Sequence, residues 1–240
     1  MRNLKVTLEY DGRGFRGWQV QPGQRTIQGE LYDAFCQMGD PEGLRITGAG
    51  RTDAGVHAVG QVASVLTTAV HSPEIMVKGL NGKLPRDIIV RAVEEVPLSF
   101  NARYDAKSRS YRYVFIRKPT AIWRGYYYQV KGDLDIEEMR RALHSIRGER
   151  DFASFATTGD VPSTRCDLLE ADLVESGPLL TVSLRADHFL YNMIRTLAGT
   201  LLRIGRGSGE DILEILDRRD RAAAGPVLPP YALYFMEVEY

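Results

Sequence analysis

The chain contains few of the residues that form disulfides and metal sites. Its 240 residues include two cysteines, Cys36 and Cys166, and four histidines, and none of them has the spacing of metal ligands. We therefore expect neither a disulfide framework nor a metal. No apolar run reaches the ~18 residues of a membrane span, and the N-terminus enters a strand pattern rather than the apolar core of a signal peptide. A cytoplasmic protein without a membrane partner is expected.

An excess of charge of one sign is also absent, because 31 basic and 31 acidic residues give a formal net charge of +0. Nucleic-acid-binding proteins generally carry a basic excess that neutralises phosphates, so this total argues mildly against such a partner. The charges are unevenly distributed, however. Six basic residues and a single acid, Asp105, lie between Arg103 and Lys118, and the first 25 residues carry five basic residues against two acids. Such runs are often only solvated surface, so both interpretations stay open here.

Apolar residues alternate as in half-buried strands in both halves of the chain, and between these segments they recur at helical spacing. Strands are predicted at residues 4–10, 61–66, 88–93, 111–115, 126–130, 168–174, 179–185 and 233–238, and helices at 26–38, 73–79, 135–146, 189–204 and from 211. The regular alternation of a doubly wound sheet is missing. The pattern predicts an α+β fold of two similar lobes, 1–104 and 105–240, that share a mixed, largely antiparallel sheet flanked by helices.

One carboxylate, Asp53, lies in a run of glycines and alanines at residues 48–58. Residues this small leave room for a large substrate to approach, and glycine tolerates unusual backbone angles. Arg51, two residues earlier, could keep the carboxylate ionised and also bind an anionic ligand. A tight turn with a surface aspartate is an equally good interpretation of the composition alone.

A second glycine-rich segment, residues 12–17, matches the G-x-G-x-x-G dinucleotide pattern and follows a strand. That pattern works only where its glycines open a helix whose N-terminus holds a pyrophosphate. Here the next predicted helix begins at Thr26, too late for this purpose. A nicotinamide or flavin oxidoreductase is therefore a weak interpretation. The segment, which carries Arg16, is better suited to lie against a phosphate backbone.

Several segments, in order along the chain, resemble the tRNA pseudouridine synthase A family. They are residues 9–12, 15–21, 26–28, 50–57 (GRTDAGVH), 81–88, 100–103, 111–113 and 189–195. The resemblance runs from about residue 4 to residue 240. It implies the pseudouridine synthase fold with a central RNA-binding cleft, and isomerisation of uridines 38, 39 and 40 in the anticodon stem-loop of tRNA. It also implies a homodimer that needs no cofactor.

The resemblance assigns roles to individual residues. Asp53 matches the family's nucleophilic aspartate, Tyr111 the tyrosine that contacts the target uracil, and Arg195 the basic residue that pairs with the aspartate. Arg51 matches an arginine used on RNA near the flipped base. Further RNA contacts are expected from Arg16, Arg103 and Arg165. Residues 157–164 depart from the family pattern, so no RNA contacts are assigned to them.

The chemistry is consistent with these residue types. Making pseudouridine breaks the N-glycosidic bond and joins uracil C5 to ribose C1′ without net redox change, so no cofactor is required. A carboxylate with an ordinary pKa of ~3.9 is ionised at neutral pH. Asp53 could then add to C6 or C1′, or remove the 2′ proton, and the residues do not decide among these. Tyr111 can stack on the uracil and offer a phenol for proton transfer from C5, although a core aromatic is the alternative.

Arg195 belongs to an otherwise apolar predicted helix, where an unpaired guanidinium would be costly to bury, so a carboxylate partner is expected. A non-catalytic RNA-binding protein would show the same basic strips and aromatic residues. The combination of Asp53, Tyr111 and Arg195 favours the enzyme over that alternative.

Overall fold

The computed structural model describes residues 1–39, 43–157 and 163–240. These residues divide into two compact units, Met1–Lys107 with Tyr234–Tyr240, and Ser108–Leu233. The division expected from the sequence placed every residue after 104 in the second lobe. The two divisions differ because β10 (Leu233–Glu239) pairs in parallel with a strand of the first unit. Such long-range pairing leaves no local pattern in the sequence.

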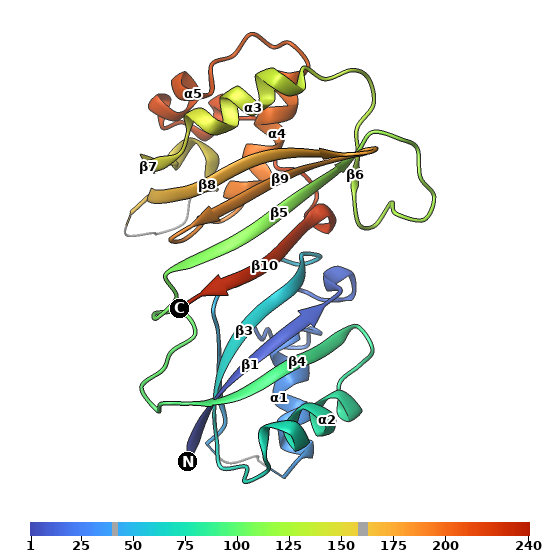
Figure 1. The fold of residues 1–240 in the computed structure, drawn as a ribbon, viewed down its shortest axis with the longest axis vertical. Coiled ribbons are helices and arrows are strands. Elements are labelled where there is room, and N and C mark those ends of the chain that lie inside the picture. The colour runs from blue at the N-terminus through green and yellow to red at the C-terminus, as the bar shows by residue number, and fades with distance from the viewer. Residues whose placement is uncertain (40–42, 158–162) are drawn as a thin grey trace. The chain divides into compact units, whose positions relative to one another are not determined.

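The first unit contains a sheet with the strand order β4-β1-β3-β10, in which β2 also pairs with β3. Its elements are β1 (Arg2–Tyr10), α1 (Ile27–Gln37), β2 (Arg45–Gly48), β3 (His57–Thr67), α2 (Pro73–Lys83) and β4 (Ile88–Val96). All pairs except β3 with β10 are antiparallel. Helices α1 and α2 pack on each other, and Figure 1 shows them beside this sheet. The segment that carries Asp53 joins β2 to β3, so the sheet holds both of its ends.

The core of this unit follows from the alternation in β1. Leu4, Val6 and Leu8 are fully buried, and burying each side chain of this size contributes about 1.5–3 kcal/mol. Tyr10 continues the same face and is 3% exposed. Helix α1 begins where predicted because the Thr26 side chain accepts a hydrogen bond from the backbone N–H of Gly29.

The second unit contains an antiparallel sheet with the order β5-β9-β8-β7, and β6 pairs in parallel with β5. Its elements are β5 (Ser108–Ile116), β6 (Tyr128–Gln129), α3 (Ile136–Ser145), β7 (Gly148–Asp151), β8 (Arg165–Ser176), β9 (Leu179–Ala186), α4 (Met193–Gly205) and α5 (Ile212–Arg218). Figure 1 shows the three helices on one side of this sheet. The described chain also has short 3-10 helices η1 (Gly12–Gly14), η2 (Ala153–Phe155), η3 (Arg221–Ala223) and η4 (Pro230–Ala232). The predicted α+β class, with largely antiparallel strands, is confirmed.

Some predicted boundaries of helices and strands are wrong. Helix α4 begins at Met193 rather than residue 189, because Asn192 has a left-handed φ of 62° that no helix accepts. Helix α2 continues past Gly79 to Lys83. The strand expected at 126–130 is reduced to β6, because the N–H groups of Tyr126 and Tyr127 both donate to the carbonyl of Trp123. Strand β7 was not predicted.

The helices within the described ranges are all too short or too polar to cross a membrane.

Candidate active site

Asp53 opens a tight turn between β2 and β3. The N–H of Val56 donates to the carbonyl of Asp53 at 3.1 Å, and Gly55 adopts a φ of +83° that favours glycine. Arg51 is exposed and Asp53 is half-buried, whereas Thr52 between them is 6% exposed. The two interpretations of this segment are therefore compatible, because Asp53 lies at the start of a turn and is accessible to solvent.

The glycines of residues 12–17 support the Asp53 turn by direct backbone contact. A Cβ atom on Gly12 would lie 1.9 Å from the carbonyl oxygen of Val56, and one on Gly17 would lie 2.6 Å from that of Thr52. Gly17 also has a φ of +92°, and the next residue, Trp18, donates its backbone N–H to the Thr52 carbonyl at 3.0 Å. These glycines are needed because two loops pack backbone to backbone.

The structure also shows whether the G-x-G-x-x-G pattern of residues 12–17 opens a helix. The glycines form η1, which is a single 3-10 turn, and the next helix starts at Ile27. The predicted start of the next helix at Thr26 is therefore confirmed, and it lies after these glycines rather than at them. The contact between these glycines and the Asp53 turn was not foreseen.

A chain of buried polar side chains also contacts the Asp53 segment. The hydroxyl of Tyr10 is 2.8 Å from Oγ1 of Thr52, and Nε2 of Gln61 donates to the Gly50 carbonyl at 2.9 Å and to the Tyr10 hydroxyl at 3.4 Å. Burial raises the pKa of Tyr10 to about 12, so its phenol keeps its proton at neutral pH. The strand pattern predicted Tyr10 as a core residue but gave no sign of these partners.

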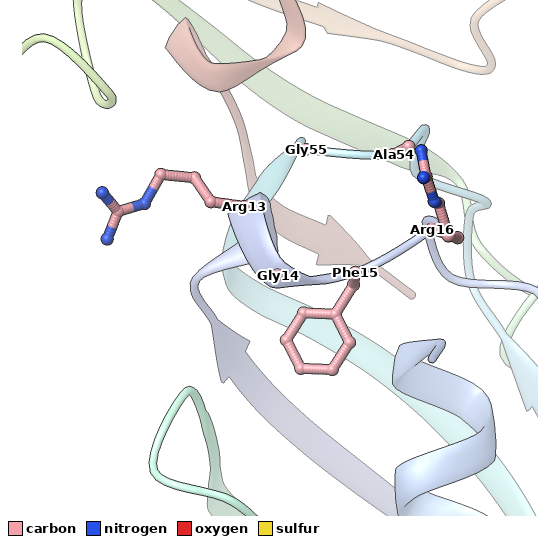
Figure 2. Close-up of a pocket in the computed structure, with 6 residues that line it drawn as sticks. All are labelled: Arg13, Gly14, Phe15, Arg16, Ala54 and Gly55. Atoms are coloured by element: carbon pink, nitrogen blue, oxygen red, sulfur yellow. The ribbon is translucent and has the colours of Figure 1, made fainter. Parts of the chain in front are cut away.

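An open depression of about 430 Å³ adjoins the turn, lined by Arg13, Gly14, Phe15, Arg16, Ala54 and Gly55. Figure 2 shows the side chains of Arg13 and Arg16 extending in different directions from it. Arg13 is paired with Asp11, at 2.6 Å between Nη2 and Oδ2. Within the described ranges neither Arg16 nor Arg51 has a carboxylate in salt-bridge range. Both guanidinium groups thus keep their charge available for an anionic ligand such as a phosphate.

Tyr111 lies on β5 in the second unit, opposite Leu184 of β9. It is 9% exposed, and its ring meets that of Phe189 edge to face, with centroids 5.1 Å apart. The edge contact leaves a face of the phenol ring that is not used by Phe189. A stacking role and a core role are both compatible with this geometry.

Arg195 lies in the first turn of α4 and is half-buried. Its Nε donates to the carbonyl of Leu228 at 2.6 Å and its Nη1 to Oδ1 of Asn192 at 2.7 Å. The amide of Asn192 in turn donates to Oγ1 of Thr157 at 3.0 Å. Two neutral acceptors of its own unit, the Leu228 carbonyl and the Asn192 amide oxygen, therefore contact this guanidinium. Asp53 and Arg195 belong to different units, and their pairing stays a prediction.

The other arginines predicted to contact RNA have different surroundings. Arg103, in the first unit, is exposed and its guanidinium lies 5.6 Å from the centre of the Tyr104 ring. Arg165, in the second unit, donates to Glu149 at 2.8 Å, a bond that raises the pKa of Arg165. The segment 157–164, which departs from the family pattern, consists largely of residues 158–162, and these lie outside the described ranges.

In the part of the chain that the structure describes, no group of three His, Cys, Asp or Glu side chains could hold a metal ion.

Comparison with known proteins identifies the class. A family model described as tRNA pseudouridine synthase matches residues 7–105 and 142–240. A tRNA pseudouridine synthase A from Geobacillus sp. (strain WCH70) is 42% identical, over 100% of this chain and 98% of its own. Relatives of the same name from Caldicellulosiruptor bescii and Citrifermentans bemidjiense are 38% and 41% identical, over 100% of this chain and 100% and 98% of their own.

The chain belongs to the tRNA pseudouridine synthase family. It is therefore an enzyme of the isomerase class, and its full-length relatives carry the name tRNA pseudouridine synthase A. A chain from the crystal structure of a Cbf5-Nop10-Gar1 complex is 11% identical over 82% of this chain and 54% of its own, with a TM-score of 0.31, which is too low to support any conclusion.

Proposed function

We propose that this enzyme converts uridine to pseudouridine at positions 38, 39 and 40 in the anticodon stem-loop of tRNA, with Asp53 as the nucleophile on a flipped-out nucleotide. The observation that carries the proposal is the Asp53 turn. It is accessible, it is flanked by glycine and alanine, and it adjoins two arginines that carry no carboxylate partner within the described ranges. The names of the relatives supply tRNA as the substrate class.

Each residue then has a step in the reaction. Extruding a nucleotide costs on the order of a few kcal/mol, which contacts between phosphates and arginines such as Arg16 offset. Arg51 enters the space that the base leaves. Asp53 attacks C6 or C1′, or removes the 2′ proton, and the bond between N1 and C1′ breaks. The uracil turns, C5 joins C1′, and Asp53 leaves the carbon it attacked or returns the 2′ proton. The proton lost from C5 is balanced by one gained at N1.

The second unit supplies the remaining groups in this proposal. Tyr111 stacks on the uracil and takes part in proton transfer from C5. Arg195 stabilises the carboxylate of Asp53. Its contacts with Leu228 and Asn192 hold the guanidinium within its own unit.

We also propose that the enzyme acts as a homodimer in which one tRNA contacts both protomers. The resemblance to the family supports this, and a formal net charge of +0 fits a need to combine two surfaces against a polyanion. Location in the cytoplasm stays a prediction from the sequence.

The decisive test is Asp53→Ala, assayed for pseudouridine on a tRNA anticodon arm. Loss of the nucleophile should lower turnover at least ~1000-fold while the dissociation constant for RNA stays within about threefold of wild type. Asp33→Ala is a matched control, since Asp33 is an exposed residue of α1 in the same unit and should behave as wild type. Substantial turnover by Asp53→Ala would overturn the proposed mechanism.

A second assay tests the site of modification. Three anticodon arms, each with a single uridine at position 38, 39 or 40, should all be converted. Product on a different arm of full-length tRNA, with none on these substrates, would overturn the proposed positions but leave the isomerase activity intact.

A further inference from the structure

Three buried polar side chains form a continuous chain next to the Asp53 turn. Gln61 is 0% exposed, Tyr10 3% and Thr52 6%. They come from three different elements, because Tyr10 ends β1, Gln61 belongs to β3 and Thr52 belongs to the segment after β2. Polar groups buried to this degree must find hydrogen-bond partners, and these three satisfy one another.

Gln61 is the donor at one end of this chain. The amide nitrogen of Gln61 has two protons, which go to the Gly50 carbonyl and the Tyr10 hydroxyl, and its Oε1 accepts from the N–H of Val62 at 3.2 Å. The Tyr10 oxygen thus accepts a bond from Gln61, and its hydroxyl forms a second bond with the Thr52 hydroxyl, 2.8 Å from Oγ1, in which either group can donate.

The hydrogen bonds of this chain reach Gly50 and Thr52, the residues on either side of Arg51. The carbonyl of Gly50 is held by Gln61, the hydroxyl of Thr52 by Tyr10, and the carbonyl of Thr52 by the N–H of Trp18 at 3.0 Å. Residues 50 to 55 have no large apolar side chain that could anchor them in the core. Hydrogen bonds are therefore what keeps Thr52 inward and the neighbouring Arg51 and Asp53 outward.

We propose that Tyr10 and Gln61 are positioning residues of this enzyme, which act through Gly50 and Thr52 to hold Asp53 and Arg51 in their reactive orientation. The proposal rests on the proposed role of Asp53. Displacing a reacting group by about 1 Å can cost on the order of 100-fold in rate. Loss of this chain should accordingly lower the rate of the chemical step far more than the affinity for RNA.

The test compares Tyr10→Phe, Thr52→Val and the double variant in single-turnover reactions on an anticodon arm. Tyr10→Phe keeps the ring that packs 6.4 Å from that of Trp18 and removes only the hydroxyl. Each single variant should lower the single-turnover rate about 10- to 100-fold, with the dissociation constant changed less than about threefold. The double variant should be no slower than the worse single variant, because both substitutions break the same bond.

Two further variants separate positioning from general stability. Thr52→Ser keeps the hydroxyl and should restore the rate to within about threefold of wild type. Tyr240→Phe removes a tyrosine hydroxyl that donates to the Ala102 carbonyl at 3.0 Å in the same unit, and it should leave the rate unchanged. If Tyr10→Phe fails to fold, the Thr52→Val and Thr52→Ser pair still decides the question.

The proposal is overturned if Tyr10→Phe or Thr52→Val reacts as fast as Tyr240→Phe, or if their losses appear only in RNA affinity. Asp53→Ala is assayed beside them. Activity retained by Asp53→Ala contradicts the nucleophile itself, whereas an inactive Asp53→Ala with a fully active Tyr10→Phe contradicts only the positioning role.

Discussion

The arginines beside the Asp53 turn differ from those around α3 in the second unit. Around α3, Arg140 pairs with Glu137, Arg141 with Glu138 and Arg147 with Asp172. Beside Asp53, Arg16 and Arg51 have no carboxylate partner in the described part of the chain. Among the described residues, carboxylates thus pair with these three arginines around α3 but not with Arg16 or Arg51.

This difference explains how a protein with a formal net charge of +0 can bind a polyanion. Affinity for RNA depends on the cations that can meet phosphates, and an arginine already bonded to a carboxylate releases fewer counterions on binding. Total charge is therefore a poor guide to RNA affinity when some arginines are paired with carboxylates and others are not. The comparison predicts that unpaired arginines contribute to function and paired ones do not.

The largest effect is expected for Arg51. Arg51→Ala should lower kcat/KM on an anticodon arm about 100-fold, because Arg51 is exposed, lies two residues from Asp53 and, in the proposed mechanism, contacts the RNA near the flipped base. Arg51→Lys should recover only part of this loss, since an ammonium lacks the planar fork of the guanidinium. Arg141→Ala, at an exposed ion pair on α3, is the matched control and should retain wild-type kcat/KM.

Equal losses for Arg51→Ala and Arg141→Ala would contradict the distinction between paired and unpaired arginines.

A smaller effect is expected at the depression of Figure 2, where Arg16 and Arg13 can be compared directly. Arg16→Ala should weaken RNA binding about fivefold and reduce the slope of log Kd against log salt by about 1, as expected for one lost phosphate contact. Arg13→Ala should change both quantities less, because Arg13 already bonds to Asp11. RNA-binding titrations at several salt concentrations measure both the Kd and its dependence on salt. A larger change in slope for Arg13→Ala would reverse the assignment.

Local patterns predicted much of the fold. The start of α1 depends on one side chain, Thr26, and the bond it accepts from Gly29 three residues later. The alternation in β1 likewise depends only on neighbours. The start of α4 was wrong because Phe189 continues the apolar run of the helix, yet its ring packs on Tyr111 and the chain turns at Asn192 first. A contact with another strand overrode the local periodicity.

The candidate site was predictable only in part, for the same reason. The small residues around Asp53 mark it as accessible, and the family resemblance adds its role. The support for the turn, by contrast, comes from Gly12, Gly17 and Tyr10, which are distant in sequence and meet it only in the folded unit. For Arg195 the sequence predicted a carboxylate partner, which stays a prediction. It gave no sign of the contact with the Leu228 carbonyl, since every residue has a carbonyl.

The smallest effect is expected for Arg165, which the family resemblance assigns to RNA and the structure pairs with Glu149. Both side chains are more than half exposed, at 54% and 65%, so water screens this pair and phosphate can compete for the arginine. Arg165→Ala should therefore weaken RNA binding only about twofold. Glu149→Gln should strengthen it by a similar factor, because it releases the guanidinium. If Glu149→Gln leaves the affinity unchanged while Arg16→Ala lowers it, Arg165 belongs with the paired arginines of α3 rather than with those beside Asp53.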